Sequence, residues 1–419
     1  MTTKQDKRIA DVRVTPIAFY DPPLLNNAGC HQPWALRSII EVETESGVIG
    51  LGESYGSQDL IGGVERAANA LRGLDVTDIN GLFARVAASI EDREIGYNTG
   101  AGSTVLRVGG AIEVAMWDAY GKSTNRRVCD LMGGQVRDSV PFSAYLFYKF
   151  ANHKHEEGPD VWGEVLTPEQ LVEEARMFKE IGGFDAIKLK AGILPPEEEL
   201  AGLEALRVAF PNSPLRIDPN GGWTVETTLK LLPRLQGLIE YLEDPTVGID
   251  GNAQVQAQTD IPLATNMYVV QPKHLPENAI KDGFRVILSD HHYWGGLQKS
   301  RELAAICRIW GLGLSMHSNS HLGISLAAMT HLAAATPNLT YGCDTHYPWQ
   351  MDDVIAEGRF QFKNGGLTVP EGPGLGVTLD RAELKRLHQN YLTCGYTSRD
   401  DEIEMKKYWP AWDFARPAF

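Results

Sequence analysis

The chain of 419 residues has a formal net charge of −15, with 43% hydrophobic and 22% charged residues. This length and apolar content suffice for a large buried core, and the negative charge argues against a nucleic-acid partner. The five cysteines show no CxxC spacing, which indicates reduced thiols and argues against a disulfide framework or a structural zinc site.

Residues 1–14 are polar and charged and lack the apolar segment of a secretory signal, so we expect a cytoplasmic protein. The longest small and apolar stretch, residues 323–335, is interrupted by Thr330 and His331 and is too short to cross a bilayer. We therefore expect no membrane partner.

The N-terminal part begins with β-type runs at residues 12–17, 37–44 and 48–52, and a turn at Ser46-Gly47 separates the last two. This pattern predicts a small antiparallel meander. Residues 24–34, between the first two runs, lack periodicity and are expected to form a loop. Residues 59–133 have apolar positions at helical spacing. Strands followed by helices predict an α+β domain over residues 1–135.

From residue 139, short β-type runs alternate with amphipathic helices. We expect strands at 141–148, 186–190, 215–218, 239–243, 262–266, 285–290, 313–317 and 339–344, and helices at 168–181, 197–210, 225–235, 251–259, 272–282, 296–310 and 324–335. This alternation predicts a (β/α)8-type barrel over residues 136–358. A doubly wound open sheet is the alternative, disfavoured because no strand precedes a glycine-rich phosphate-binding motif. Residues 359–419, with a helix at 381–391, are expected to pack back on the first domain.

Polar side chains end six consecutive predicted strands. They are Lys188 and Lys190, Asp218, Glu243, Asn266, Asp290 and His317. In a barrel the carboxyl ends of all strands lie on one rim, which is where barrel enzymes build their active sites. The sequence therefore predicts a catalytic site at this rim.

Two carboxylates and one amide, from Asp218, Glu243 and Asn266, are hard oxygen ligands that suit Mg²⁺. Each residue alone is equally compatible with a solvated turn or a helix N-cap. Lys188 and Lys190 share one face of their strand, which is either the barrel interior or the outside. If they face inward, one amine becomes a candidate general base. Schiff-base chemistry is the alternative, disfavoured by the neighbouring oxygen ligands.

His317 and Asp290 end neighbouring strands and form a candidate His–Asp dyad, although a lone histidine of this kind is more often structural. The lysines would lie across the barrel mouth from this dyad, so a substrate carbon between them could exchange a proton on either face. A metal ion with two such bases suits abstraction of a proton alpha to a carboxylate, through an ene-diolate.

The chain resembles the enolase superfamily, and more narrowly the glucarate dehydratase family, over essentially its whole length. The resemblance rests on Lys188-Leu189-Lys190, Asp218-Pro219-Asn220-Gly221, Glu243-Asp244-Pro245, Ala264-Thr265-Asn266-Met267, Asp290 before His291-His292-Tyr293-Trp294, His317-Ser318-Asn319 and Asp344-Thr345-His346. It implies a modified TIM barrel, (β/α)7β, under an α+β capping domain. We also expect a homo-oligomer.

The resemblance also implies roles for individual residues. Lys190 and His317 would be the two bases, Asp290 the partner of His317, Lys188 and Asn220 the supports of the ene-diolate, and Asp218, Glu243 and Asn266 the Mg²⁺ ligands. Substrate contacts would fall on Asn26, His31, Thr104, Tyr145, Ser318, Asn319, His346 and Arg399.

The reaction implied is Mg²⁺-dependent loss of water from an acid sugar, D-glucarate or its C5 epimer L-idarate, giving 5-keto-4-deoxy-D-glucarate. Lys190 is followed by Ala191 where the family has glycine, and this departure at the mouth leaves the preferred hexarate open. The alternatives are another hexarate such as galactarate, or epimerisation or racemisation at the same site. A catalytically silent barrel that binds acid sugars is the alternative from another class.

Overall fold

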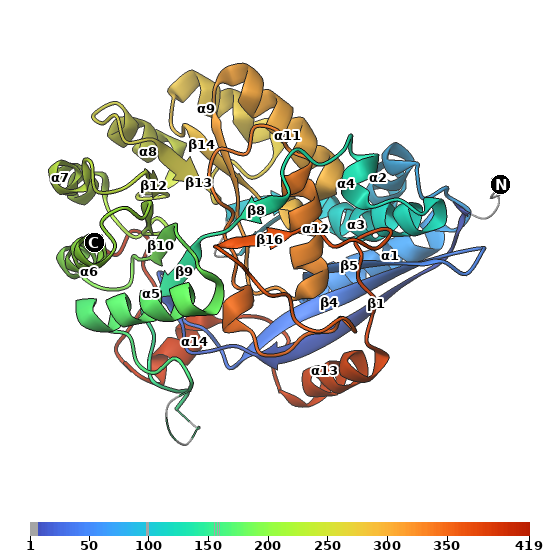
Figure 1. Cartoon of the computed structure of the whole chain (residues 1–419), viewed down its shortest axis with the longest axis horizontal. Helices are drawn as coiled ribbons and strands as arrows, with labels where there is room; N and C mark the ends of the chain where they lie inside the picture. Colours follow the sequence, from blue (N-terminus) through green and yellow to red (C-terminus); the bar gives the residue numbers. More distant parts are fainter. Residues whose placement is uncertain (1–6, 98–99, 155, 157, 159) are drawn as a thin grey trace.

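The structure is a computed structural model that describes residues 7–97, 100–154, 156, 158 and 160–419. A strand-and-helix region built from the N-terminal part lies beside a barrel of parallel strands and outer helices (Figure 1). Within the described residues, no helix combines the length and the apolar character needed to cross a bilayer.

The N-terminal region contains the expected antiparallel meander, in the order β1-β4-β5. Its elements are β1 (Ile9–Tyr20), β4 (Trp34–Thr44), β5 (Ile49–Tyr55), α1 (Gln58–Leu71), α2 (Ile79–Ser89), α3 (Thr104–Thr124) and α4 (Val128–Leu131). Helix α3 is buried along most of its length, between β5 and the barrel helix α11 (Gly296–Trp310). It therefore joins the two parts of the molecule.

Two predictions for this region are wrong in detail. The expected loop at residues 24–34 contains a small hairpin, β2 (Leu25–Asn26) with β3 (Gly29–Cys30). The expected helical stretch contains a second hairpin, β6 (Glu94–Tyr97) with β7 (Gly100–Ser103). This second hairpin is rich in glycine, which has a low helix propensity and breaks the helical pattern around it.

Close contact between β5 and α3 depends on a glycine. A Cβ atom on Gly50 would overlap the carbonyl oxygen of Ala115 and lie 2.6 Å from the backbone nitrogen of Ala119. Gly50→Ala is therefore expected to lower the free energy of unfolding by about 3 kcal/mol, because neither helix backbone atom can move aside. Chemical denaturation measures the difference.

The matched control for Gly50 is Gly62→Ala in α1, where an added Cβ would meet only the flexible guanidinium tip of Arg66. This change should alter the free energy of unfolding by less than about 1 kcal/mol, in the stabilising direction. Equal stability of the two variants would contradict the packing argument.

In the described chain, the barrel sheet contains seven parallel strands in sequence order. The strands are β9 (Ala144–Phe147), β10 (Ile187–Lys190), β11 (Leu215–Asp218), β12 (Tyr241–Glu243), β13 (Leu263–Thr265), β14 (Val286–Ser289) and β15 (Gly313–Met316). The outer helical elements are α5 (Pro168–Gly182), α6 (Pro196–Ala209), α7 (Val225–Leu235), α8 (Gly248–Gln256), η2 (Pro272–His274), α9 (Leu275–Lys281), α10 (His291–Trp294), α11 and α12 (Gly323–Ala334).

The expected eighth strand, residues 339–344, is not a regular strand and makes only an isolated bridge between Cys343 and Phe142. Backbone bonds nevertheless close the barrel there. Cys343 N donates to Pro141 O at 2.8 Å, and Asp344 N donates to Met316 O at 2.8 Å on the other side. The segment thus joins β15 to the residues before β9. The barrel prediction is confirmed, in a form that replaces the last strand by an irregular closing segment.

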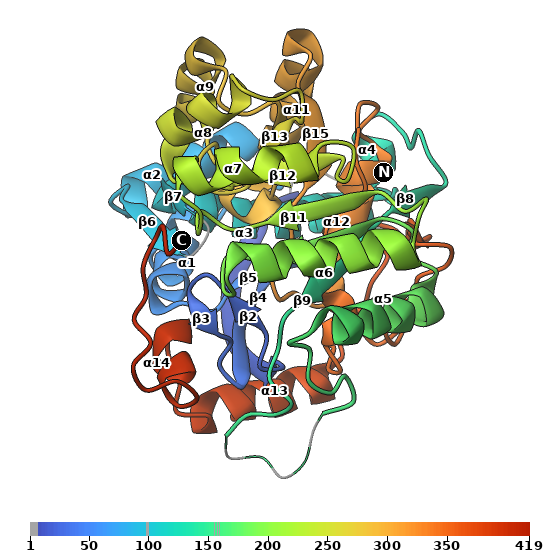
Figure 2. The ribbon, with the colours of Figure 1, turned by 90° about the vertical axis from the view of Figure 1, so that its left-hand side faces the viewer.

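The C-terminal segment contacts both parts of the molecule. A short strand, β16 (Gly366–Thr368), pairs with β8 (Ser139–Pro141). Helix α13 (Arg381–Thr393) packs on β1, and helix α14 (Asp401–Lys406) packs on β3. Figure 2 shows both as red helices, with α14 beside β3. The last residues were expected on the first domain. Instead, Ala418 N and Phe419 N donate to Gly222 O on the barrel.

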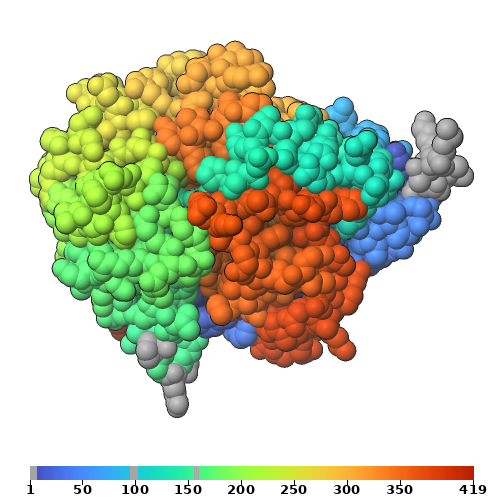
Figure 3. Space-filling model, in the orientation of Figure 1, coloured from blue at the N-terminus to red at the C-terminus, as the bar shows by residue number. Residues whose placement is uncertain are grey.

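In Figure 3, the orange and red C-terminal part of the chain occupies the centre of the visible face. There it lies between the green and yellow barrel surface and the blue N-terminal part. The largest buried apolar cluster runs through the barrel and includes residues of all three parts, such as Phe19, Leu263 and Leu387. This cluster therefore joins the N-terminal region to the barrel. The N-terminal strands and helices also enclose a second cluster of their own, which includes Ile40, Val64 and Ile112.

Candidate active site

A cavity at the carboxyl ends of the barrel strands collects most of the predicted site residues. It is lined by Asn26, His31, Tyr145, Phe147, Lys190, Asn220, His317, Ser318, Asn319, His346 and Arg399. Every substrate contact predicted from the sequence except Thr104 is among them. Phe147, the last residue of β9, carries no polar group and was not predicted.

Thr104 lies elsewhere, at the first residue of α3. Its Oγ1 donates to the carbonyl oxygen of Glu91 at 3.0 Å and accepts from the backbone nitrogen of Arg93 at 2.8 Å. It lines a separate small hollow with Tyr55 and Arg107. The structure does not bring Thr104 to the cavity, because its hydroxyl is engaged in the turn that starts the helix.

Lys188 and Lys190 both point into the barrel, which decides between the two orientations left open by their spacing. Lys188 is fully buried, and its Nζ lies 2.7 Å from both Glu243 Oε2 and Asp344 Oδ2. Lys190 reaches the cavity, and its Nζ donates to Asp218 Oδ2 at 2.7 Å. The two amines therefore occupy different places, one inside the carboxylate cluster and one at its edge.

The environments of the two lysines predict different chemistry. Burial alone would lower the pKa of Lys188, but Asp344 and Glu243 outweigh it and raise that pKa well above its ordinary value. Lys188 therefore remains an ammonium ion at neutral pH, suited to stabilising negative charge. Lys190 makes fewer carboxylate contacts and faces the cavity, which is the position required of a base.

Three buried carboxylates gather beside these lysines. Oxygen atoms of Asp218, Glu243 and Asp244 all lie within 4.8 Å of one another. Burial raises the pKa of Glu243 well above its ordinary value, with Asp218 adding to the effect, and raises the pKa of Asp244 to about 7. For Asp218 burial acts in the same direction, but Lys190 and Lys188 outweigh it and lower the pKa. The cluster thus has more negative charge than its lysines compensate.

Asn266 follows β13, and its buried side chain lacks hydrogen-bond partners. Its side-chain Oδ1 and Nδ2 are both buried without a hydrogen-bond partner, while its backbone nitrogen donates to Asp244 Oδ2 at 2.9 Å. Burying an amide without hydrogen-bond partners costs free energy, unless another group binds its oxygen or nitrogen. An oxygen-binding cation at Asp218, Glu243 and Asn266 would supply that group and balance the carboxylates.

The turn after β11 positions Asn220. Asn220 has a φ of 57° and Gly221 a φ of 77°, both in the left-handed region that favours Asn and Gly. Asn220 N donates to Asp218 Oδ1 at 3.0 Å, and its own side-chain Oδ1 is buried without a partner. The turn residues thus serve the local fold and also direct an amide into the cavity.

His317 forms the predicted dyad with Asp290. Its Nδ1 lies 2.9 Å from Asp290 Oδ2, and its ring lines the cavity. Burial lowers the pKa of His317, against the opposing contact with Asp290, so the ring is neutral at pH 7. Burial would raise the pKa of Asp290, but His292 and His317 lower it well below its ordinary value. The geometry gives a neutral imidazole backed by a carboxylate.

Arg399 connects the C-terminal segment to this cavity. Its Nε and Nη2 donate to Asp401 at 2.7 and 2.6 Å, and Asp401 also accepts from Asn26 Nδ2 at 2.9 Å. A hairpin of the N-terminal region and the segment before α14 are thereby tied together over the barrel mouth. The cavity is thus covered by chain segments from both ends of the sequence.

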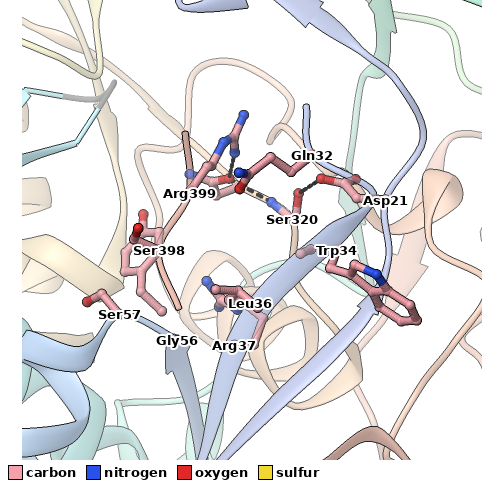
Figure 4. A pocket seen from close by; sticks show the side chains of 13 residues that line it. Asp21, Gln32, Trp34, Leu36, Arg37, Gly56, Ser57, Ser320, Ser398 and Arg399 are labelled. Carbon is pink, nitrogen blue, oxygen red and sulfur yellow. Dashed lines mark hydrogen bonds between the residues drawn. The ribbon is translucent and has the colours of Figure 1, made fainter. Parts of the chain in front are cut away.

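A larger cavity of about 230 Å³ adjoins the first and shares Asn319 and Arg399 with it. It lies between β4 and the loop after β15, where Ser320 Oγ donates to Asp21 at 3.3 Å, and Arg37 and Arg399 face it from opposite sides (Figure 4). We call this larger cavity the antechamber, because it adjoins the inner cavity.

Sequence reasoning assigned no role to Asp244, Asp344 or His292. Asp244 and Asp344 complete the charged cluster, and His292 contacts Asp290. Asp344 ends the last predicted strand, so the strand-end pattern that selected the other residues could have found it. His292 had no such signal, because nothing in a His-His pair distinguishes the ring that faces Asp290.

Comparison with known proteins gives two family matches. The model described as "Mandelate racemase / muconate lactonizing enzyme, N-terminal domain" matches residues 28–133. The model described as "Enolase C-terminal domain-like" matches residues 170–383.

Among individual relatives, a "Probable glucarate dehydratase" of Streptomyces coelicolor is 47% identical, over 97% of this chain and 98% of the relative. An enolase of Thermobispora bispora, crystallised with magnesium and formate, is 52% identical with a TM-score of 0.96, over 98% of this chain and 100% of that chain. One of Pseudomonas fluorescens, with bound magnesium, potassium and tartrate, is 46% identical with a TM-score of 0.95, over 98% and 99%.

Proposed function

The chain belongs to the enolase superfamily, and we propose that it is a Mg²⁺-dependent acid-sugar dehydratase that acts on D-glucarate and L-idarate. One observation carries the proposal: His317 and Lys190, from strands across the barrel, line the same cavity beside the buried carboxylates. A carbon between these two bases presents one face to each. Such a site suits removal of a proton alpha to a carboxylate in either configuration.

Asp218, Glu243 and Asn266 would hold the metal ion. The uncompensated carboxylates and the unpaired amide of Asn266 support this assignment, as do the related structures crystallised with magnesium. When bound, Mg²⁺ supplies positive charge that favours the ene-diolate form of the substrate carboxylate.

His317 Nε2 would remove the C5 proton of D-glucarate, and the electrons of the broken C–H bond form the ene-diolate. Lys188 stays charged within the carboxylate cluster and adds positive charge beside Asp218 and Glu243. The amide of Asn220, which lines the cavity, would support the ene-diolate. Collapse of the ene-diolate expels the neighbouring C4 hydroxyl, which leaves as water with a proton returned by the imidazolium. The enol that remains tautomerises to 5-keto-4-deoxy-D-glucarate.

For L-idarate, the C5 epimer, the proton lies on the opposite face. The amine of Lys190 would remove it and become an ammonium ion. Collapse of the ene-diolate would again expel the C4 hydroxyl, which leaves as water with the proton returned by this ammonium ion. His346, Asn319 and Arg399 would bind the far end of the hexarate, since they line the cavity beyond the bases.

A panel of hexarates tests the substrate. The purified protein with Mg²⁺ is incubated with D-glucarate, L-idarate and galactarate, and the 2-keto acid is detected. We expect turnover of the first two. Turnover of galactarate alone would overturn the named substrate, and epimer exchange without loss of water would overturn dehydration in favour of epimerisation.

The metal assignment gives a separate prediction. Removing divalent cations should abolish dehydration, and Asn266→Ala should raise the Mg²⁺ concentration for half-maximal activity by about tenfold or more, because even indirect contacts to a metal contribute that much. Magnesium titration of activity and of Tm measures both. The matched control is Asn212→Ala, an exposed asparagine between α6 and β11, which should leave the titration unchanged. Equal metal requirements of the two variants would exclude Asn266 as a ligand.

A further inference from the structure

Asp290 contacts two histidines. Its Oδ2 lies 2.9 Å from His317 Nδ1, and its Oδ1 lies 2.6 Å from His292 Nδ1 and accepts from the backbone nitrogen of His292 at 2.9 Å. All three side chains are buried. The candidate base therefore belongs to a longer chain of contacts than a His–Asp pair.

The contacts of His292 Nε2 determine which ring nitrogen carries the proton. Nη2 of Arg37 lies 2.8 Å from His292 Nε2, and Ser325 Oγ lies 2.7 Å from the same nitrogen. A guanidinium can only donate hydrogen bonds, so Nε2 must accept and carries no proton. The ring is then neutral with its proton on Nδ1, from where it donates to Asp290.

Arg37 is itself held in place by the N-terminal region. It lies on β4, beside the antechamber of Figure 4, and its Nε donates to Glu53 Oε1 at 3.0 Å. Glu53 on β5 also accepts from the backbone nitrogens of Leu322 and Ser325, at 2.8 and 2.9 Å, at the start of α12. Strands β4 and β5 of the N-terminal region thus hold the guanidinium of Arg37 behind the candidate base of the barrel, His317.

We propose that His292 and Arg37 are positioning residues for His317, acting through Asp290 in the order Arg37, His292, Asp290, His317. The role of His317 as a base rests on the function proposed above. Through Arg37, the N-terminal sheet thus sets the orientation and basicity of His317 in the barrel.

The physical reason lies in how Asp290 divides its two oxygens. His292 engages Oδ1 as a neutral donor, so Oδ2 is left for the Nδ1–H of His317, and Nε2 of His317 faces the cavity as the acceptor of a proton. Nε2 of His292 accepts from Arg37, so His292 offers Asp290 a hydrogen bond from Nδ1 and no second cation. The charge of Asp290 therefore remains available for the imidazolium that His317 becomes.

Other ionisable groups also face these two rings. Around His317 they are Asp290, Tyr293, Lys188, Asp344, Asp218, His321 and His346. Around His292 they are Asp290, Arg37, Tyr55, His291 and His321. Neither substitution below removes any of these neighbours, so a shift in the pH profile can be assigned to the ring that changes.

Two substitutions of His292 separate positioning from folding. His292→Phe keeps the ring volume but removes the donor to Asp290, which leaves more charge on Asp290 and raises the pKa of His317. We expect kcat for D-glucarate to fall about tenfold or more through loss of alignment, and the acid limb of kcat/KM to move to higher pH. His292→Asn retains an N–H near the position of Nδ1 and should restore much of both.

L-idarate provides the internal control, because its proton would be removed by Lys190. Turnover of L-idarate should change little in His292→Phe. His331→Phe removes a buried imidazole of α12 that accepts from the backbone nitrogen of Cys129, and it should change the turnover of neither substrate. Equal losses for both hexarates in His292→Phe would assign His292 to folding alone. An unchanged rate and acid limb with D-glucarate would overturn the proposal.

A measurement without substrate distinguishes failure of this inference from failure of the proposed function. In the ¹⁵N NMR spectrum of labelled protein, His292 should be neutral with its proton on Nδ1, and the titration of His317 should move upward in His292→Phe. A proton on Nε2 of His292, or an unmoved titration, overturns the inference. If the wild-type protein dehydrates neither hexarate, the proposed function fails. The NMR result still decides whether His292 positions His317 through Asp290.

Discussion

His317→Asn is expected to lower kcat for D-glucarate by about 10²–10⁴-fold, the range that a positioned general base contributes. Asparagine can still donate to Asp290 but offers no basic nitrogen to the cavity. In the wild-type protein, burial lowers the pKa of His317, so its neutral form persists below the ordinary histidine value of 6.5. The activity of wild-type protein on D-glucarate should therefore fall only when the pH drops below about 6.5.

The loss of activity in His317→Asn should also differ between D-glucarate and L-idarate. L-idarate should still exchange its C5 proton with solvent in His317→Asn, because Lys190 faces the cavity independently of the dyad. His331→Asn is the matched control, a buried histidine of α12 away from the cavity. Full dehydration of D-glucarate by His317→Asn would show that another group removes the proton.

Lys188→Met is expected to lower the free energy of unfolding by about 3–5 kcal/mol in metal-free buffer, the cost of leaving buried charge unpaired. Lys188 Nζ lies 2.7 Å from Glu243 and Asp344 and 3.4 Å from Asp218, and all four side chains are fully buried. Methionine fills the space but leaves these carboxylates without their shared cation. Dehydration should be lost as well, since the same ammonium contacts Asp218 and Glu243, two of the proposed metal ligands.

Denaturation with and without Mg²⁺ measures this effect. The ion should reduce the stability loss, because it compensates the same carboxylates. Lys230→Met is the matched control, since the Lys230 side chain is 76% exposed and its nearest carboxylate oxygen is 4.0 Å away. The control should shift stability by less than about 0.5 kcal/mol. A Lys188→Met protein as stable as the wild type without metal would contradict the charge balance described here.

The alternation of strands and helices was readable from sequence because each barrel strand is a short apolar run between turn residues. The strand ends were readable because only polar residues interrupt those runs at the rim, as Asp218 and Glu243 do. The eighth strand was not, since Cys343 and its neighbours have β-type composition but make irregular bonds on both sides. The hairpin at 94–103 was missed because its glycines were placed within a helical stretch.

Side-chain partners were harder to predict than positions. The Lys188-Leu189-Lys190 run fixes two lysines on one face but leaves open which face is inside, and only the pairing with Asp218 and Glu243 decides it. Thr104 illustrates the opposite case, since its position was readable but its partners, the backbone of Glu91 and Arg93, were not. His292 depends on Arg37, which is distant in sequence, so no local pattern could show that contact.

The central claim is best tested by ¹H NMR of D-glucarate incubated with the protein and Mg²⁺ in D₂O. The account predicts that D-glucarate is converted to 5-keto-4-deoxy-D-glucarate, and that His317→Asn leaves the D-glucarate signals unchanged over the same period. Unaltered D-glucarate with the wild-type protein, or replacement of its C5 proton by deuterium without formation of the keto acid, would contradict the account.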